Sequence, residues 1–464
     1  MKTFKPYTPN QIYLLPPNMN DWLPEGHLAP FIADVVDQLD MKLIYASYAE
    51  GGDRGQPPYH PAMMMKLLIY AYCTGKPSSR RIERATWEEV AYRVLSADQH
   101  PDHDSIAEFR KRHLKVLSDL FLQVLRLCQK AGLVKLGHVA LDGTKVKAAA
   151  SKHKAMSYER MGKAEAELEK EIEELLRRAE DADAEEDAKY GKGKRGDELP
   201  EELKRRESRL AKIRAAKAAL EAEAKERAVS KAKEVREELK ERKAKEKESG
   251  QKARGRTPVI SDPKEATPDP KAQRNFTDPE SRIMKDGASK GFEQAYNAQV
   301  AVDEESQVIV AAGVTQETND KKQLIPMIKK VKENTRKLPE VVSADAGYFS
   351  EVNVTAKDLK TVDLYIPPDR QKHGEKQPTV RGRPPKDLSV ADRMRRKLRT
   401  KAGQEVYRFR KAIVEPVFGQ IKEARRFRRF SLRGLIKVEA EWTLVCLTHN
   451  LLKLFRSGWM PQEV

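Results

Sequence analysis

The feature that most constrains this 464-residue chain is a long charged segment in its middle. Residues 161–250 hold 25 basic and 26 acidic side chains, are rich in Ala, Glu, Lys and Leu, and contain almost no aromatic residues. This composition is typical of long helices stabilised by Glu–Lys pairs four residues apart. We therefore expect residues 155–256 to form a charged helical hairpin or coiled-coil arm, broken at Lys189–Pro200. Apolar heptads are sparse, so partial disorder is the alternative.

The residues before this segment indicate a compact group of helices. Residues 30–135 contain runs with dense or periodic apolar residues, joined by short turns. One run begins after Pro61, and another opens with Ser105 and Glu108 at the spacing of a capping box. We therefore predict an all-α N-terminal domain over residues 1–135.

The rest of the chain alternates between strand and helix patterns. A first strand is expected within residues 136–154, before the charged insertion. After it, a Pro-rich linker is expected at residues 257–290, and a β-hairpin, further strands and amphipathic helices at residues 291–464. We expect Asn319 or Asp320 to cap the helix that follows the hairpin. This order predicts a mixed α/β sheet that the charged hairpin interrupts after its first strand.

Positive charge is concentrated near the C-terminus. The chain has a net charge of +18, and residues 371–460 alone hold 23 basic and 8 acidic side chains. A basic field of this size indicates a polyanionic partner, of which nucleic acid is the commonest. In Arg425–Gly434, phenylalanines alternate with arginines, a pattern that suits phosphate contacts combined with base stacking.

Cysteine usage and the N-terminus indicate the cellular compartment. Cys73, Cys128 and Cys446 lie far apart in apolar surroundings, without the spacing of metal ligands, which is usual for reduced thiols. The first residues contain no apolar run long enough for a signal peptide or a membrane span. We therefore expect an intracellular protein without a membrane partner.

Two apolar runs end on an aspartate: Val139–Asp142 and Val341–Asp345. An aspartate after a strand is often only a turn residue. If the two strands are neighbours, however, both carboxylates emerge at the sheet edge where ligands of α/β folds bind. Lys145 and Lys147, which follow the first aspartate, would then contact phosphate.

A third carboxylate, Glu415, lies in a helical run. At about 100° per residue, Lys411 and Lys422 share its helix face within about 40°. Pro416 is expected to kink or begin a helix. Three carboxylates without His or Cys ligands suggest hard ions with oxygen ligands, Mg²⁺ or Mn²⁺. Two such ions, roughly 4 Å apart, stabilise the attacking and the leaving oxygen in phosphoryl transfer.

At these residues the sequence resembles a known family. "LDGTKVKAAAS" is similar to the first Asp motif of the DDE-type transposases of bacterial insertion sequences, "SADAGYFS" to the second Asp motif, and "YRFRKAIVEPVFGQIK" to the Glu block. "PDHDSIAEFRKRH" resembles the helical N-terminal domain of the family, and "EWTLVCLTHNLLKL" its closing helix. The resemblance is to the superfamily of insertion sequences 4 and 5, and more narrowly to insertion sequence 1182.

The resemblance implies a fold and an active site. The fold is a ribonuclease-H-like, mixed-sheet catalytic domain, interrupted by the charged helical hairpin and preceded by the all-α domain, which would bind DNA ends. Asp142, Asp345 and Glu415 would be the catalytic residues and the ligands of two Mg²⁺ ions, for which Mn²⁺ would substitute.

The family also has a Tyr-Arg-Glu-Lys signature around this glutamate. Lys422 has the expected spacing from Glu415. The arginine position falls on Lys411, with Arg410 beside it, and Tyr407 lies one place off.

The implied activity is DNA transposition. The enzyme would bind the terminal inverted repeats of its element as a homodimer, cut the ends by two-metal phosphodiester hydrolysis, and join the freed 3′-OH to target double-stranded DNA. The residues expected to contact DNA are Lys145, Lys147, Arg410, Lys411, Lys422, Arg425, Arg426, Arg428 and Arg429. The expected location is the bacterial cytoplasm, in association with the nucleoid.

The sequence leaves three alternatives open. One is a metal-dependent DNA nuclease on the same fold that does not join strands. Another is a domesticated, non-catalytic DNA-binding protein, against which the presence of all three carboxylates argues. The third is a coiled-coil interaction protein, which fits the charged arm but not the aspartates at the strand ends.

Overall fold

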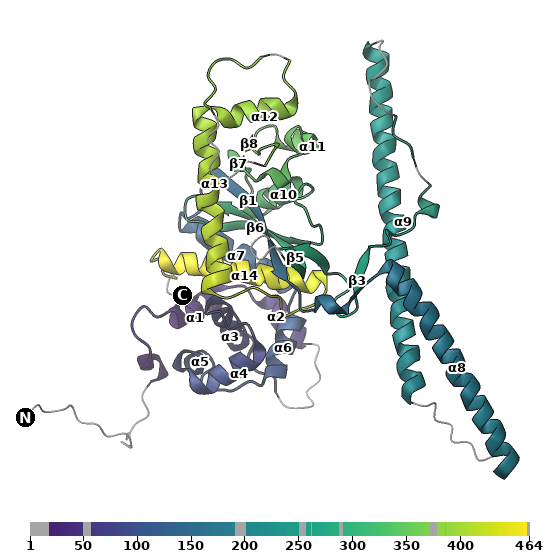
Figure 1. The fold of residues 1–464 in the computed structure, drawn as a ribbon. Helices are drawn as coiled ribbons and strands as arrows, with labels where there is room; N and C mark the ends of the chain where they lie inside the picture. Colours follow the sequence, from purple (N-terminus) through teal and green to yellow (C-terminus); the bar gives the residue numbers. More distant parts are fainter. Residues whose placement is uncertain are drawn as a thin grey trace, which may run out of the picture. The chain divides into compact units, whose positions relative to one another are not determined.

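The structure is a computed structural model that describes residues 18–49, 57–190, 201–249, 257–260, 262–286, 291–370, 378–385 and 387–461. It divides into two compact units (Figure 1). The first unit comprises Met1–Lys147 and Tyr296–Val464, and the second comprises Ala148–Ala295. The second unit is therefore an insertion into the first. Most of the expected break at Lys189–Pro200 lies outside the described residues.

The N-terminal part of the first unit is helical, as expected. Its helices are α1 (Leu28–Gln38), α2 (Lys42–Ala49), α3 (Pro61–Cys73), α4 (Ser79–Glu88), α5 (Val90–Leu95), α6 (His103–Arg112) and α7 (Val116–Lys130). The long run after Ser105 forms two helices rather than one. The predicted capping box is wrong, because Asp102 caps α6: its side chain accepts hydrogen bonds from the backbone N–H groups of Asp104 and Ser105.

A mixed sheet forms the other half of the first unit. Its strands are β1 (His138–Lys147), β5 (Phe292–Asp303), β6 (Ile309–Thr315), β7 (Val341–Ser343) and β8 (Asp363–Tyr365). β5 and β6 form the expected antiparallel hairpin, whereas β1, β7 and β8 run parallel. β1 lies between β5 and β7, so the first strand of the chain occupies the middle of the sheet.

Strand β1 is longer than the sequence analysis suggested. Asp142 ends its apolar half, but the strand continues as far as Lys147. The last residue is held by the C-terminal region, because its N–H donates to the carbonyl of Arg428 and its carbonyl accepts from the N–H of Phe430. Asp142 is thus in mid-strand, while Asp345 follows β7 by two residues.

Four longer helices accompany the sheet strands. They are α10 (Leu324–Thr335), α12 (Val390–Arg399), α13 (Lys401–Gly419) and α14 (Leu435–Arg456), and a short helix, α11 (Glu351–Val354), follows β7. α10 contacts β6, whereas α13 contacts β1, β7 and β8. The helix after the hairpin begins at Leu324, and Gln323 occupies its cap position. The prediction of Asn319 or Asp320 as its cap is therefore wrong.

Helix α13 runs through Pro416 without ending. The proline lacks the N–H that would bond the carbonyl of Ala412 four residues earlier. That carbonyl instead accepts a hydrogen bond of 3.0 Å from the side-chain amide of Gln307. The helix begins at Lys401 and is followed by a π-helical turn, Gln420–Ala424, so the expectation that a helix begins at Pro416 is wrong.

Helix α14 is the central element of the first unit. It contacts α1, α3 and α7 of the N-terminal region and β6 of the sheet, and most of its side chains are buried on all sides. Buried polar groups fix its position. Asn450 exchanges two hydrogen bonds of 2.8 Å with the backbone of Ile309 in β6. On the other side, the hydroxyl of Tyr72 in α3 donates to Glu441 at 2.9 Å.

These contacts make the N-terminal helices part of the same compact unit as the sheet. The N-terminal region is therefore less separate than the sequence analysis suggested. Its apolar faces are buried against α14, a helix that lies more than 300 residues later in the chain.

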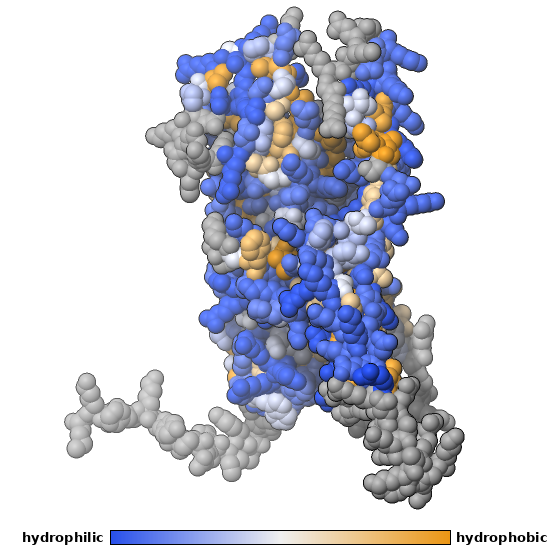
Figure 2. All heavy atoms as spheres, turned by 45° about the vertical axis from the view of Figure 1, so that its right-hand side comes forward, coloured by the Kyte–Doolittle hydropathy of each residue, from blue (hydrophilic) through white to orange (hydrophobic). Residues whose placement is uncertain are grey.

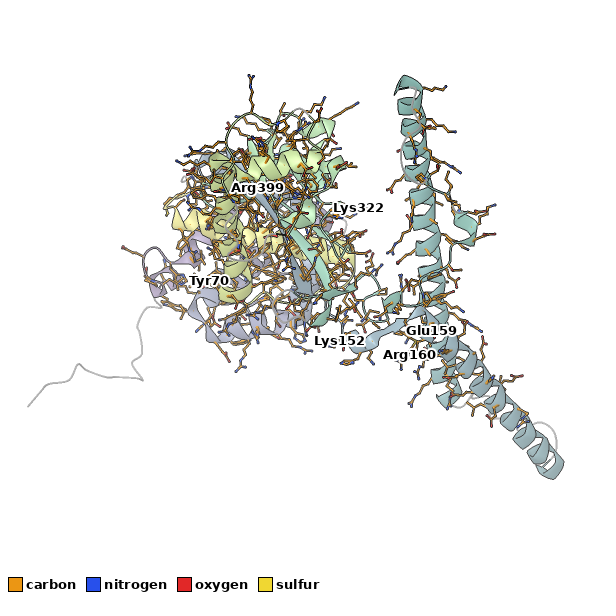
Figure 3. The ribbon with its side chains drawn as sticks, turned by 45° about the horizontal axis from the view of Figure 1, so that its top comes forward. Tyr70, Lys152, Glu159, Arg160, Lys322 and Arg399 are labelled. Carbon is orange, nitrogen blue, oxygen red and sulfur yellow. The ribbon has the colours of Figure 1, made fainter. Side chains whose placement is uncertain are left out.

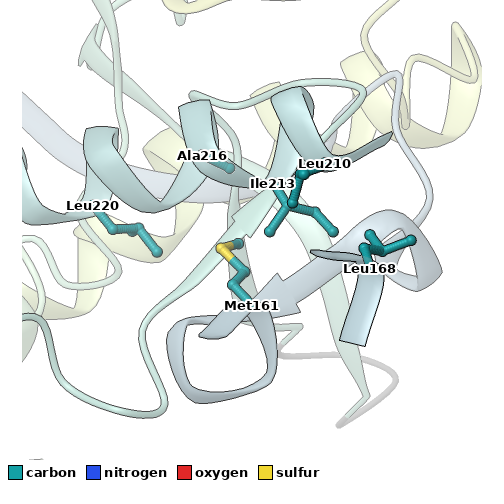
Figure 4. Close-up of a cluster of buried hydrophobic side chains, with 6 residues drawn as sticks. All are labelled: Met161, Leu168, Leu210, Ile213, Ala216 and Leu220. Atoms are coloured by element: carbon teal, nitrogen blue, oxygen red, sulfur yellow. The ribbon is translucent and has the colours of Figure 1, made fainter. Parts of the chain in front are cut away.

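The second unit contains the charged helical hairpin. Its elements are β2 (Ala155–Ser157), α8 (Tyr158–Tyr190), α9 (Glu201–Ser249), β3 (Gln273–Asn275) and β4 (Arg282–Lys285). α8 and α9 pack together through the small apolar cluster drawn in Figure 4, which includes Met161, Ile213 and Leu220. Glu159 and Arg160, at the start of α8, are exposed (Figure 3).

The segment expected to be a Pro-rich linker is partly folded. β3 pairs antiparallel with β2, and β4 pairs with the first residues of β5. Arg274 and Arg282 both bond the carboxylate of Glu223 in α9. These pairings tie the returning chain to the hairpin, which the proline content alone did not predict.

No helix in the described ranges is both long enough and apolar enough to cross a membrane. The face drawn in Figure 2 is predominantly hydrophilic, with scattered apolar side chains.

Acid is expected to destabilise the first unit through His449. This side chain is buried in α14 and donates from Nε2 to the carbonyl of Gln307 at 2.9 Å, and burial lowers its pKa to about 3. In the unfolded chain its pKa is near 6.5, so only the unfolded state takes up a proton between those values. The free energy of unfolding should therefore fall by about 2 kcal/mol through this group between pH 7 and pH 5.

Urea denaturation at both pH values, with His449→Gln as the comparison, measures this effect. The variant keeps a donor for Gln307 but cannot titrate. It should lose less stability on acidification than the unaltered protein. Equal losses would contradict the assignment.

Candidate active site

Asp142 and Asp345 lie close together, as expected from the strand ends. They come from β1 and β7, which are adjacent and parallel. Asp142 accepts a hydrogen bond of 2.8 Å from the N–H of Gly143. Asp345 caps a short 3₁₀ helix, Ala346–Tyr348, by accepting from the N–H of Gly347 at 2.9 Å. Both carboxylates are therefore fixed by local backbone geometry.

Arg410 faces these acids from α13, the helix that packs against β1, β7 and β8. Its guanidinium donates to Oδ2 of Asp142 at 3.2 Å, and the two side chains are only 10% and 22% exposed. Its Nε is buried without a hydrogen-bond partner. The ring of Tyr407 lies 5.6 Å from the guanidinium. Arg410 was expected to contact DNA, but here its charge is directed at Asp142.

The surroundings of both acids favour the protonated form. Burial raises the pKa of Asp142 to about 6; Asp345 also raises it, whereas Arg410 opposes the rise. Burial, and then the neighbouring Asp320, raise the pKa of Asp345. Such a concentration of partly buried carboxylates is typical of catalytic and metal sites.

Asp320 is a member of this group that the sequence analysis did not identify as a site residue. It lies between β6 and α10, and its Oδ1 accepts hydrogen bonds of 2.7 Å from the side-chain amides of Asn297 and Gln299. The buried hydroxyl of Tyr348 in turn donates to Gln299.

The sequence does carry a signal for this residue. Asn297 and Gln299 are polar residues two positions apart in an apolar strand, so they share one face of β5. A pair of buried amides on one strand face requires a polar partner nearby. Asp320 is this partner, although it was expected to be a helix cap.

Lys145 lies beside all three aspartates. Burial lowers the pKa of its amine, while Asp320, Asp345 and Asp142, in that order, raise it. The sequence analysis predicted a phosphate contact for Lys145. The structure shows that its charge also compensates the acids.

Glu415 lies on α13 but is exposed, and the charged groups that most affect Asp142 and Asp345 do not include it. Glu415 is five residues after Arg410, so the two side chains point about 140° apart around the helix axis. Arg410 is the one that faces Asp142. The structure thus brings together two of the three predicted catalytic residues and leaves Glu415 on another face of its helix.

Lys411 and Lys422 were expected to share a helix face with Glu415. The α-helix does not continue as far as Lys422. This lysine lies in the π-helical turn, where the regular α-helical spacing is lost. Its amine donates to the carbonyl of Lys145 at 2.9 Å. Lys422 is therefore close to β1, and Lys411 is exposed.

The remaining basic residues divide by exposure. Arg426, Arg428 and Arg429 are exposed, and Lys147 is partly exposed. Arg425 is buried, and it donates to the carbonyl of Val445 and to the hydroxyl of Thr448 in α14. In this position Arg425 supports the core, so we do not retain it in the candidate DNA surface.

The phenylalanines between these arginines are core residues. Phe427 and Phe430 are 4% and 1% exposed and pack against each other and against Trp442. The expectation that these rings stack on bases is therefore wrong. The segment is irregular, with Arg426 at a positive φ of 54°, and it turns both rings into the core while Arg426, Arg428 and Arg429 stay exposed.

Among the described residues, no three His, Cys, Asp or Glu side chains are arranged so that they could hold a metal ion. Arg410 and Lys145 provide positive charge around the acids instead. The oxygen donors of this site are nonetheless of the type that Mg²⁺ and Mn²⁺ prefer.

Comparison with known families is consistent with this geometry. Residues 17–112 match the family described as Transposase domain (DUF772), and residues 263–451 match the family described as Transposase DDE domain. The chain is a DDE-type transposase of an insertion sequence. Comparisons with curated proteins and with solved structures gave no match.

The extent of the second match is informative. It begins in the second unit, after α9, and includes Asp320, Asp345 and Glu415, but not Asp142. Asp142 lies outside both matched ranges, and it is the sheet that brings β1, which carries Asp142, directly beside β7. DDE transposases generally use divalent metal ions, and their substrate is DNA.

Gly143 is expected to be intolerant of any side chain. A Cβ at this position would lie 2.8 Å from Oδ1 of Asp320 and 2.9 Å from Oδ1 of Asn297, and closer still to the amide of Gln299. These groups are bonded to one another, so they cannot move apart independently. Gly143→Ala should lower the free energy of unfolding by about 1–3 kcal/mol.

Chemical denaturation measures this loss. Gly419→Ala is the matched control, because a Cβ there meets no atom within 4 Å and the residue has helical dihedrals. The control should be neutral or stabilising. A Gly143→Ala protein as stable as the control would contradict the crowding.

Proposed function

We propose that this transposase binds the terminal inverted repeats of its element, cuts the DNA at those ends and joins the freed 3′-OH to target DNA. The observation that carries the proposal is the position of Asp142, in β1, beside Asp345, two residues after the adjacent parallel strand β7, in a partly buried site with Arg410. Two carboxylates from neighbouring strands suit metal-assisted phosphoryl transfer, as the family assignment leads us to expect.

The sheet supports a ribonuclease-H-like catalytic domain. An antiparallel hairpin, β5 and β6, lies on one side of a central first strand, and two parallel strands, β7 and β8, lie on the other. The insertion enters after β1, so the catalytic domain is built from chain segments on both sides of it.

The carboxylate oxygens at the site are of the chemical type that Mg²⁺ prefers, so two Mg²⁺ ions, for which Mn²⁺ would substitute, are the proposed cofactors. Asp142 and Asp345 offer hard oxygen ligands, and their raised pKa values indicate that a nearby cation would stabilise their ionised forms. When bound, the ions would stabilise charge on the attacking and leaving oxygens.

The protein's own residues hold the DNA near these acids. Lys147, Lys411 and Lys422 would contact the phosphate backbone close to the cut, because backbone contacts position DNA without reading its sequence. The cluster Arg426, Arg428 and Arg429 would extend this contact. The helices of residues 1–135 would bind the DNA ends. Two ends must be joined, so a homodimer is the proposed active form.

Glu415 remains the proposed third catalytic residue of the family triad. On DNA, α13 would have to present it to the aspartates in place of Arg410. The π-helical turn beyond it is a feature that often marks functional positions in helices.

Glu415→Gln tests this assignment. The side chain is exposed, so unfolding should be unchanged, whereas cutting of a labelled end fragment should fall by at least about a hundredfold if the carboxylate acts in the transition state. Lys411→Gln, an exposed change one turn earlier, is the control and should weaken DNA binding instead. Normal cutting by Glu415→Gln would remove this residue from the triad.

Asp142→Asn is expected to abolish cutting and leave end binding intact. The substitution preserves the shape of the side chain but removes the charge that would hold a cation. End cleavage is measured with Mg²⁺ and a labelled inverted-repeat fragment, and binding is measured by gel shift without metal. Asp358→Asn, which changes an exposed aspartate that pairs with Lys329, is the control and should cut normally.

Strand joining is measured in the same reaction by adding a supercoiled plasmid. A transposase joins the labelled end to the plasmid. Cutting without joining would identify the protein as a metal-dependent nuclease. Cutting by Asp142→Asn at the normal rate would exclude this site as the reactive centre.

A further inference from the structure

We propose that Asp320 supplies a third aspartate ligand to the metal centre that Asp142 and Asp345 form. The inference rests on the proposed function, because it assumes that these two aspartates bind divalent ions. It adds a residue from the β6–α10 connection to a centre otherwise built from β1 and from the segment that follows β7.

The side chain of Asp320 is held in one orientation. Its Oδ1 accepts from Nδ2 of Asn297 and from Nε2 of Gln299, both at 2.7 Å. Gln299 is itself held by the hydroxyl of Tyr348, which follows Asp345 in the chain. A ligand oriented by fixed hydrogen-bond donors is the usual arrangement around protein-bound metals.

The second oxygen of Asp320 faces Asp345. The point where Gly347 would carry a Cβ lies 3.4 Å from Oδ2 of Asp320 and 3.0 Å from Oδ1 of Asp345. The two carboxylates therefore approach one another across a residue that has no side chain. Oδ2 of Asp320 is the oxygen that neither anchoring amide uses.

A buried acceptor beside Asp320 is also unsatisfied. Asn297 is fully buried, and its Oδ1 has no hydrogen-bond partner, although its Nδ2 is used twice. A Cβ added to Gly143 would lie 2.9 Å from this oxygen and 2.8 Å from Oδ1 of Asp320. The unsatisfied oxygen is therefore near the carboxylate of Asp320. A buried oxygen without a donor is costly, and a bound cation or its water is a partner of the right charge.

A structural role at the helix start does not account for Asp320. Gln323 takes the cap position of α10, and Asp320 contributes only its backbone carbonyl to that turn. The negative side chain is directed to the acids instead of to the helix.

The acids as described are not gathered closely enough to hold one ion. Two cations accompany the three carboxylates here, since Arg410 bonds Asp142 at 3.2 Å and Lys145 is the second cationic side chain that interacts with them. For a metal ion to bind, Arg410 and Lys145 would have to move away from the carboxylates. Divalent ions and Arg410 would exchange at the same carboxylates.

Binding of Mn²⁺ alone tests the proposal. Electron paramagnetic resonance measures the free ion during a titration of the full-length protein without DNA. Asp320→Asn keeps an oxygen that can accept from Asn297 and Gln299 but removes the charge. Its dissociation constant for Mn²⁺ should rise at least about tenfold, as Asp142→Asn should also show, while the exposed Asp358→Asn should bind normally.

A second variant keeps the test valid if Asp320→Asn folds poorly. Gly347→Ala removes no carboxylate but places a methyl group between Asp320 and Asp345, so it too should weaken Mn²⁺ binding. If Asp142→Asn weakens binding and both other variants bind normally, Asp320 is not a ligand and the proposed function stands. If Asp142→Asn also binds normally, the metal centre itself is wrong.

Discussion

The structure of the first unit depends on the burial of α14 between two parts of the chain. Its apolar surface packs against the N-terminal helices on one side and against β6 on the other. Polar groups inside it are satisfied by specific partners, such as Glu441 by Tyr72 and Asn450 by Ile309. Because an unpaired polar group in such a core is costly, these bonds fix the position of the helix more strictly than apolar contacts alone. The indole of Trp442 extends this control to the site, since it donates to the backbone of Gln299.

Electrostatic balance explains the arrangement of the site. Carboxylates in a partly buried position repel one another and lose hydration, so their ionised forms need positive charge nearby. Arg410 comes from a helix and Lys145 from the same strand as Asp142. Both are oriented toward the acids. Positive charge of the kind that attracts DNA phosphates is thus directed at the candidate site.

Sequence reasoning identified the elements better than their ends. The alternation of strands and helices, the hairpin and the buried last helix follow from apolar periodicity, and the parallel strands placed Asp142 beside Asp345. Exposure was harder to anticipate, because Arg425, Phe427 and Phe430 are buried by tertiary contacts with α14 that no local pattern encodes. The role of Asp320 was missed for the same reason. Its partners, Asn297 and Gln299, lie on β5, about 20 residues earlier. The one sequence signal for them is that both amides are on the same face of that strand.

The pairing of β2 with β3 has a consequence for how the chain folds. Ala155 lies opposite Asn275, so this small ladder brings together the two ends of a segment more than 100 residues long. β1 must find β7 across that segment, and loop closure becomes slowly more unfavourable with the length of free chain. The helical hairpin forms locally, and the β2–β3 pairing closes it, so fewer free residues separate β1 from β7. This lowers the entropic cost of pairing β1 with β7 by on the order of 1 kcal/mol. The arm therefore imposes little kinetic burden on the assembly of the domain that it divides.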